Sequence, residues 1–108
     1  MTNAEPEFIY VTTTGWKTGT PHDIEIWYVE REGRYYIISE NRERSHWVQN
    51  IQHNPAITLR VGETTYRGIG RPLDPATEPE LVAAVSALMN EKYEWSEGLI
   101  VELTPEGA

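Results

Sequence analysis

Short runs of alternating apolar and polar residues, separated by glycine turns, constrain this fold most. Alternation with a period of two gives a β-strand one buried face and one exposed face. In residues 22–29 the two predicted faces are Ile24, Ile26 and Tyr28 against Asp23, Glu25 and Trp27. The same reasoning predicts strands over residues 8–13, 22–29, 34–39, 56–61, 64–71 and 99–103. Six short strands joined by tight turns predict an antiparallel sheet that curls into a small barrel.

Two stretches with helical spacing interrupt the predicted strands. Residues 45–53 place Trp47, Val48 and Ile51 on one side and stop at an Asn-Pro pair. Residues 77–92 open with Thr77 and Glu80, the residue types of a capping box, and carry an apolar stripe. Gly68 and Gly70 share one strand face, which predicts a bend or a close backbone approach. The chain is therefore predicted to be mainly β (α+β), with flanking helices and a single domain over residues 1–108.

Composition narrows the classes of function. The chain has 108 residues, no cysteine, and a formal net charge of −8 from 17 acidic and 9 basic side chains. This charge repels phosphate backbones, so we expect no nucleic-acid partner. No apolar run has the length of a membrane span and no secretion pattern opens the chain, so we expect no membrane partner and a cytoplasmic location. With 39% hydrophobic residues the core is limited, which favours a homodimer.

The loop TTTGWKTGTP, residues 12–21, is the first candidate site. Small and hydroxylated residues let a backbone approach a ligand closely, and successive amides can form an anion-binding concavity. Lys17 adds a mobile charge, and Thr14 and Thr18 add hydroxyl groups. A plain β-connection uses the same turn residues, so the loop by itself leaves both interpretations open.

A second candidate lies before the first predicted helix. Arg42 and Arg44 precede Ser45, a plausible N-cap, and arginine beside a helix start suits a phosphate or carboxylate. Glu40 and Glu43 partly cancel these charges, so a solvated charge cluster is the alternative. The three histidines show no metal-ligand spacing, so we expect no metal site. No nucleophile or pair of carboxylates is set up for hydrolysis, and redox chemistry would need a bound cofactor.

Taken together, these segments resemble the deazaflavin-dependent nitroreductase family, whose relatives are the flavin-binding, pyridoxamine-phosphate-oxidase-like split barrels. The resemblance rests on TTTG-W-KTG-x-P, IEIWY, G-RYYIIS, W-x-x-N-I-x-x-NP-x-I-T-L-x-VG and EKYEWSEGLIVEL, in this order. It implies a six-stranded split β-barrel, often dimeric. It also implies a cofactor, with a deazaflavin coenzyme slightly favoured over FMN.

The family commonly has a Gly-Arg-Lys-Ser/Thr-Gly loop that meets the cofactor phosphate. Gly15, Lys17, Thr18 and Gly19 match it, whereas Trp16 stands in place of the arginine. An arginine that often follows the loop proline is His22 here, so two cationic positions are weakened. The candidate cofactor-binding residues are Thr14, Gly15, Trp16, Lys17, Thr18, His22, Ile24, Ile26, Ser39, Arg44, Trp47 and Asn50. Packing logic favours Trp47 as a core anchor over a ring contact, and Asn50 could tie its helix to a strand.

The resemblance therefore implies an oxidoreductase that transfers a hydride to a small electron-poor molecule, such as a quinone or nitro compound. The ring would lie near Ile24, Ile26 and Ser39, while Tyr28, Tyr36 or water would supply a proton. Catalytic side chains are otherwise unknown. Two alternatives stay open: a non-catalytic carrier of a flavin, haem or similar ring, and a cofactor-free structural dimer of the same fold.

Overall fold

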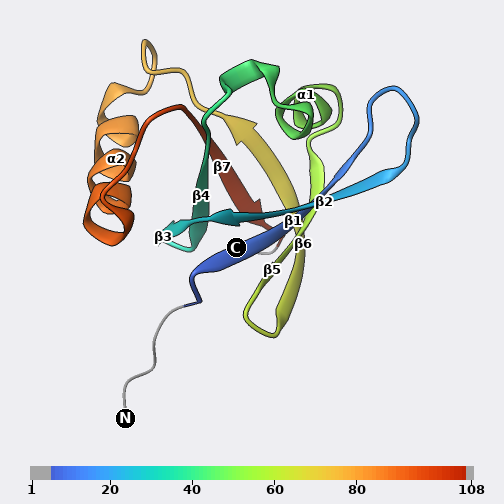
Figure 1. Cartoon of the computed structure of the whole chain (residues 1–108), viewed down its shortest axis with the longest axis horizontal. Helices are drawn as coiled ribbons and strands as arrows, with labels where there is room; N and C mark the ends of the chain where they lie inside the picture. Colours follow the sequence, from blue (N-terminus) through green and yellow to red (C-terminus); the bar gives the residue numbers. More distant parts are fainter. Residues whose placement is uncertain (1–5, 107–108) are drawn as a thin grey trace.

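The fold is a curled antiparallel sheet with one helix near each side of its open end (Figure 1). The computed structural model describes residues 6–106. Within this range seven strands form a sheet in the order β2-β1-β5-β6-β7-β4-β3. The strands are β1 (Phe8–Thr14), β2 (Pro21–Trp27), β3 (Val29–Arg31), β4 (Arg34–Ser39), β5 (Ala56–Val61), β6 (Thr64–Pro72) and β7 (Leu99–Pro105). The prediction of a mainly β fold with flanking helices is confirmed.

The number of strands differs from the predicted six because one predicted strand is two. Residues 22–29 divide at Tyr28: β2 pairs with β1, whereas β3 pairs with β4 at the opposite edge of the sheet. Consecutive strands can occupy opposite edges only if the sheet curls until its edges approach, which makes a half-barrel. The division falls at Tyr28 because Tyr93 takes up its backbone: Tyr28 N donates to the Tyr93 hydroxyl at 3.1 Å, and this hydroxyl donates to Tyr28 O at 2.9 Å.

Two strands are buried on both faces, which explains their nearly continuous apolar sequence. In β4, Tyr35 and Ile37 face the barrel interior, whereas Tyr36 and Ile38 face the second helix. In β7, Val101 faces the interior in the same way. The chain therefore has two apolar layers, one inside the half-barrel and one outside it.

Each helix covers one of these layers. The helix α1 (His46–His53) follows a short 3₁₀ turn, Arg42–Arg44, and buries Val48 and Ile51 in the interior layer. The helix α2 (Pro79–Tyr93) buries Val85 and Met89 in the outer layer. The predicted capping box is wrong: the N-cap is Glu78 and makes no side-chain cap bond, while the Thr77 hydroxyl donates to Asp74 O at 3.3 Å. Thr77 belongs to the turn before the helix. The Asp74 carbonyl closes this turn by accepting hydrogen bonds from the amides of Thr77 and Glu78, so the Thr77 side chain is not available to cap α2.

The glycines of β6 confirm the predicted close approach. A Cβ atom on Gly68 would lie 2.4 Å from Thr104 O of the neighbouring strand, and one on Gly70 would lie 3.0 Å from Ile51 of α1. A larger residue at position 68 would push β6 away from β7, and one at position 70 would push α1 off the sheet. In the described part of the chain, no helix has the length and apolar character needed to cross a membrane.

Candidate functional site

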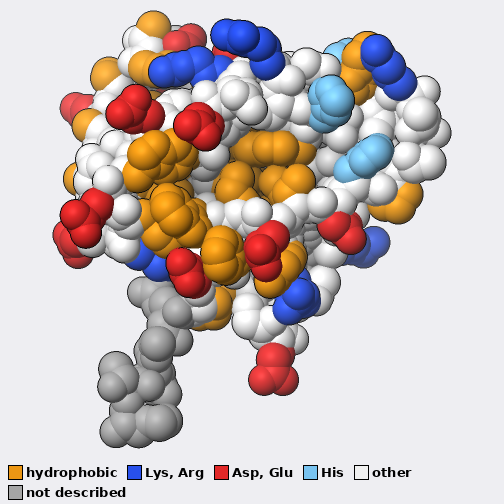
Figure 2. All heavy atoms as spheres, in the orientation of Figure 1, with side chains coloured by type: hydrophobic (Ala, Val, Ile, Leu, Met, Phe, Trp, Pro, Cys, Tyr) orange, Lys and Arg blue, Asp and Glu red, His pale blue; other side chains and the backbone are white. Residues whose placement is uncertain are grey.

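Three adjoining cavities form one groove across the open end of the half-barrel. The first, of about 190 Å³, lies beside the β1–β2 loop. The second, of about 490 Å³, shares His22, His46 and Asn50 with the first. The third, of about 560 Å³, shares Asn41, Ser45 and Trp47 with the second. We call these the loop cavity, the middle cavity and the tryptophan cavity. Figure 2 shows the apolar floor of this face, with the histidines at one side and carboxylates around the other.

The loop cavity has no carboxylate among its lining residues, although the chain carries 17 acidic side chains. Lys17, Thr18, His22 and His46 line it, together with the amide side chains of α1. Most backbone amides of the loop are committed within the protein: Gly15 N donates to Thr20 O at 2.7 Å and Gly19 N to Gly15 O at 2.7 Å. Among the described residues, no acceptor faces the amides of Lys17 and Thr18. The donors that the loop can offer an anion thus include these two amides and the Lys17 ammonium group.

Gly15 is the point at which side chains close over the loop backbone. A Cβ atom there would lie 2.9 Å from both the His22 ring and the Thr18 hydroxyl. The hydroxyls of Thr18 and Thr20 share a hydrogen bond of 2.7 Å, and Thr20 lies 3.3 Å from His22 Nε2. Because only glycine leaves this space, the loop sequence fixes where His22 and Thr18 stand.

Asn50 of α1 ties the loop to the sheet. Its amide nitrogen donates to Thr13 Oγ1 at 3.0 Å, and its oxygen accepts from Trp16 N at 3.1 Å. The side chain is 4% exposed, and both of its polar atoms are taken up by the protein. Asn50 therefore lines the groove as a positioning residue, and the expected tie between helix and strand is confirmed.

Trp16 turns away from the sheet and packs on the end of α1. Its ring stacks on the His53 ring with centroids 4.3 Å apart and an angle of 11°, and 42% of the residue is exposed. Lys17 Nζ lies 4.9 Å from the centroid of the same ring. The tryptophan that replaces the family's arginine thus supplies a flat wall beside Lys17 in place of a second charge.

The middle cavity joins the charged end of the groove to the apolar end. Arg44, Asp23 and Ile24 line it with the residues that it shares with its neighbours. Thr12 Oγ1 donates to Asp23 at 2.7 Å, which holds this carboxylate toward β1. Among residues 6–106 no carboxylate pairs with Arg44, so its guanidinium group can meet a ligand.

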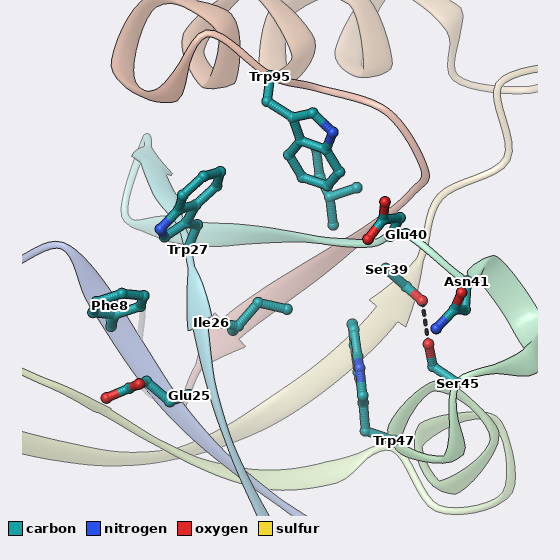
Figure 3. A pocket seen from close by; sticks show the side chains of 11 residues that line it. Phe8, Glu25, Ile26, Trp27, Ser39, Glu40, Asn41, Ser45, Trp47 and Trp95 are labelled. Carbon is teal, nitrogen blue, oxygen red and sulfur yellow. Dashed lines mark hydrogen bonds between the residues drawn. The ribbon is translucent and has the colours of Figure 1, made fainter.

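The tryptophan cavity is walled by indole rings (Figure 3). Trp27 stacks on Tyr93 with centroids 4.5 Å apart and an angle of 8°, and meets Trp95 edge-on at 6.0 Å. Trp47 lies opposite, where it also packs against the interior layer. The flat walls are fixed by these contacts and suit a planar ring.

Two serines form the polar side of this cavity. Ser39 Oγ donates to Arg42 O at 2.9 Å, and the Ser39 and Ser45 hydroxyls lie 2.6 Å apart. Since the Ser39 hydrogen is used on Arg42 O, the Ser45 hydroxyl donates to Ser39. Ser45 is the N-cap of α1, as predicted, but its side chain makes no cap bond and its hydroxyl is directed to Ser39 instead.

The structure brings the predicted site residues to one groove. Loop residues 15–18 and His22 line the loop cavity, Ile24 and Arg44 line the middle cavity, and Ile26, Ser39 and Trp47 line the tryptophan cavity. Thr14 stands apart from the cavity linings and pairs with Pro21 in the sheet. Glu40 and Asn41, which match the family segment beside the ring, line the tryptophan cavity with Ser39, whereas sequence reasoning missed Phe8, Glu25, Trp27 and Trp95. The WSEG turn after α2 was the available signal for Trp95, because Glu94 adopts the left-handed conformation with φ of 59° and ends the helix there.

The tyrosines suggested as proton donors lie elsewhere. Tyr28 and Tyr36 are 2% and 1% exposed and line none of the three cavities. Burial and the nearby Glu102 carboxylate raise the pKa of Tyr36 to about 12. Its hydroxyl donates to Glu102 at 2.9 Å, on the outer layer. These two side chains are set aside as donors because β4 turns Tyr36 outward and the corner between β2 and β3 buries Tyr28 in the interior layer. Within the described residues, no cluster of three or more potential metal-ligating side chains is found.

The sequence matches the model of the F420H(2)-dependent quinone reductase family over residues 2–98. The chain therefore belongs to this family, whose name specifies a deazaflavin cofactor. No curated protein sequence matches the chain.

Solved structures share the fold at low sequence identity. The haem storage protein HutZ from Vibrio cholerae aligns with a TM-score of 0.77 at 15% identity, over 94% of this chain and 83% of that protein. An FAD-binding protein from Mesorhizobium loti gives 0.73 at 13% identity, over 93% and 81% of the two chains. The F420-H2 dependent reductase FDR-A gives 0.63 at 22% identity, over 90% and 93%. These similarities establish the fold shared with ring-binding proteins.

Proposed function

We propose that the protein is a deazaflavin-dependent reductase of small electron-poor molecules such as quinones. One observation carries the proposal: a single groove leads from a cationic end free of carboxylates to a cavity walled by tryptophans. Family membership supplies the cofactor class. FMN, which shares a phosphate and a flat ring, is the second cofactor to test.

The residues of the groove fit a ligand with an anionic tail and a planar ring. The tail would meet Lys17 Nζ, the free amides of Lys17 and Thr18, and Arg44. The ring would lie toward Ile26 and Trp47. The reverse orientation would bring negative charge against the carboxylates of the tryptophan cavity.

When bound, a reduced deazaflavin supplies hydride transfer to an electron-poor acceptor. The chain's own residues would bind and orient the cofactor and the acceptor. Asn50 holds the loop in place, Trp27 and Trp47 flank the ring space, and the apolar floor excludes water. No side chain of the groove is placed as a proton donor, and we assign that proton to solvent.

A ring carrier without turnover is the second candidate. It is favoured by the similarity to HutZ and to the FAD-binding protein, which share this fold and bind or store ring cofactors. A homodimer in the cytoplasm belongs to the same proposal, supported by the small core and by Ile69, which is 54% exposed. Sedimentation at micromolar concentration tests the dimer: a single species of 12.4 kDa would contradict it.

Titration with a deazaflavin coenzyme, FMN and haem tests the function. Tryptophan emission reports binding, and oxidation of the reduced deazaflavin by a quinone reports turnover. Lys17→Ala should weaken deazaflavin binding by about 1–2 kcal/mol, roughly 5–30-fold, because it removes a charge-assisted contact. Arg67→Ala is the matched control, since this cation is 82% exposed on β6 and outside the groove.

Each outcome separates the candidates. Deazaflavin binding with turnover supports the reductase, and ring binding without turnover supports the carrier. Absence of binding to all three rings would show a structural protein of this fold. Equal affinities for Lys17→Ala and the unmodified protein would remove the Lys17 side chain from the site.

A further inference from the structure

We propose that the tryptophan cavity selects uncharged planar acceptors and rejects anionic ones through the carboxylates of Glu25 and Glu40. This inference rests on the proposed function and names the substrate class of the same groove. It follows from the charges, the hydrogen-bonding groups and the walls of the cavity.

The charges at the two ends of the groove are opposite in sign. Glu25 and Glu40 are the charged residues that line the tryptophan cavity, and no lysine, arginine or histidine joins them. The loop cavity has the reverse composition. An anionic cofactor tail held by the cations would thus leave the acceptor to enter over the carboxylates.

The two carboxylates face the cavity differently. Glu25 accepts a hydrogen bond from the Tyr10 hydroxyl, and the guanidinium carbon of Arg60 lies 4.2 Å from the centroid of that tyrosine ring. Figure 3 shows the Glu25 carboxylate on the side of β2 away from Ile26, so it lies at the rim of the cavity. Glu40 has no ion-pair partner among residues 6–106, and Figure 3 shows its carboxylate directed into the cavity near Trp95. The negative charge that faces the cavity is therefore mainly that of Glu40, with Glu25 at the rim.

The hydrogen-bonding groups of the cavity also favour an uncharged ligand. The Ser39 and Ser45 hydrogens are used within the protein, so both hydroxyls face a ligand only as acceptors. The remaining side-chain donors of the lining are the Asn41 amide and the indole N–H groups. A carbonyl or nitro oxygen can be met by these neutral donors, whereas a sulfonate or carboxylate would find no cation.

The walls require a flat molecule. Tyr93 holds Trp27 in a parallel stack, and Trp95 stands edge-on to it at 70°. A cavity of about 560 Å³ has space for fused aromatic rings beside the cofactor ring. The acceptor class is thus an uncharged, electron-poor aromatic molecule, such as a naphthoquinone without ionised substituents.

The test compares a neutral naphthoquinone with its sulfonated derivative. Quenching of tryptophan emission gives the dissociation constant of each without turnover, and the KM values of deazaflavin-loaded protein give a second ratio. We expect the neutral quinone to bind about tenfold more tightly at low ionic strength, because each exposed carboxylate repels the sulfonate over a few ångströms. In Glu25→Gln/Glu40→Gln the ratio should fall to about twofold or less. High salt should lower the unmodified protein's ratio in the same way.

Glu63→Gln is the matched control, since it removes the same charge at the exposed turn between β5 and β6. Its ratio should equal that of the unmodified protein. Glu40→Gln alone should lose more than half of the discrimination, because its carboxylate is the one directed into the cavity, and it disturbs no hydrogen bond of the described residues. Equal ratios in the unmodified protein and the double variant would overturn the proposal.

Failure of this inference and failure of the proposed function have different signatures. If the deazaflavin binds but both quinones bind alike, only the selection is wrong. If the quinone ratio holds and no deazaflavin binds, the reductase assignment is wrong and the charge selection stands.

Discussion

The two helices each hold one end of strand β2, and they do so by different chemistry. At the start of β2, Asn50 of α1 holds the preceding loop through two neutral hydrogen bonds. At its end, Tyr93 and Lys92 of α2 hold the backbone of Tyr28, with Lys92 Nζ donating to Tyr28 O at 3.1 Å. One strand, which lines the groove over most of its length, is thus set by two helices that belong to different apolar layers.

This difference indicates which helix serves binding and which serves the fold. The bonds of α1 set the position of a loop whose free donors face the groove. The bonds of α2 mark the corner at which the chain crosses from one sheet edge to the other, and without that corner the half-barrel would not close. We therefore expect changes in α2 to act mainly on stability and changes in α1 to act also on ligand binding.

The largest effect should come from the outer layer. Met89→Ala removes a side chain that is 0% exposed and should lower the free energy of unfolding by about 2–5 kcal/mol. Urea denaturation measures this loss, and the deazaflavin affinity of the folded variant should be unchanged. Glu91→Ala, at an exposed residue of the same helix, is the control and should change stability little. An affinity loss in Met89→Ala would break the proposed division between the helices.

Tyr93→Phe tests the corner itself. It keeps the ring that stacks on Trp27 and removes the hydroxyl that bonds Tyr28, so stability should fall by about 1–3 kcal/mol. Tyr10→Phe removes a hydroxyl from an exposed pair and should cost less. Equal losses of stability in the two variants would show that the hydrogen bonds at Tyr28 stabilise the fold no more than an exposed pair does.

A double-mutant cycle of Asn50→Ala and Thr13→Val tests the loop tie. Their hydrogen bond of 3.0 Å should give a coupling energy of about 0.5–1.5 kcal/mol, measured by denaturation of the four proteins. Asn50→Ala should also weaken deazaflavin binding several-fold, because Trp16 N loses its acceptor and the loop loosens. Thr13→Val keeps that acceptor and serves as the control for binding.

A further effect should appear only at alkaline pH. Burial raises the pKa of Tyr35 and Tyr36 to about 12, above the ordinary value of 10.0 that applies to the unfolded chain. The folded state therefore holds these protons more tightly, and its stability is complete below pH 10 and falls as the pH rises toward 12. Tyr36→Phe should reduce this slope in denaturation measured at a series of pH values. A slope equal to that of the unmodified protein would show that Tyr36 does not carry it.

Much of the fold could be predicted because its strands and helices follow from local sequence patterns. Period-two runs located the strands, and an Asn-Pro pair located the end of α1. The division at Tyr28 could not be predicted, since Tyr93 is 65 residues away and its hydroxyl reaches Tyr28 only after α2 has packed. The capping box failed for a similar reason, because the preceding turn had already taken up Thr77.

The candidate site also contains residues that the sequence identified and residues that only the tertiary structure brought together. The loop residues and Ser39 were recognisable from family-like motifs, since these residues are contiguous or follow a strand. Trp95, Glu40 and Asn41 come together with Trp27 only where the sheet curls and the segment after α2 crosses it. No spacing in the chain shows that these residues share a wall.

The sequence by itself determined most of the strands, the two helices and the identity of the loop, because these depend on neighbours a few positions apart. The tertiary structure alone decided that the sheet closes at Tyr28, which loop amides stay free, and that carboxylates gather at one end of the groove and cations at the other. Those outcomes depend on contacts between side chains from separate elements, which exist only after the sheet has curled and both helices have docked.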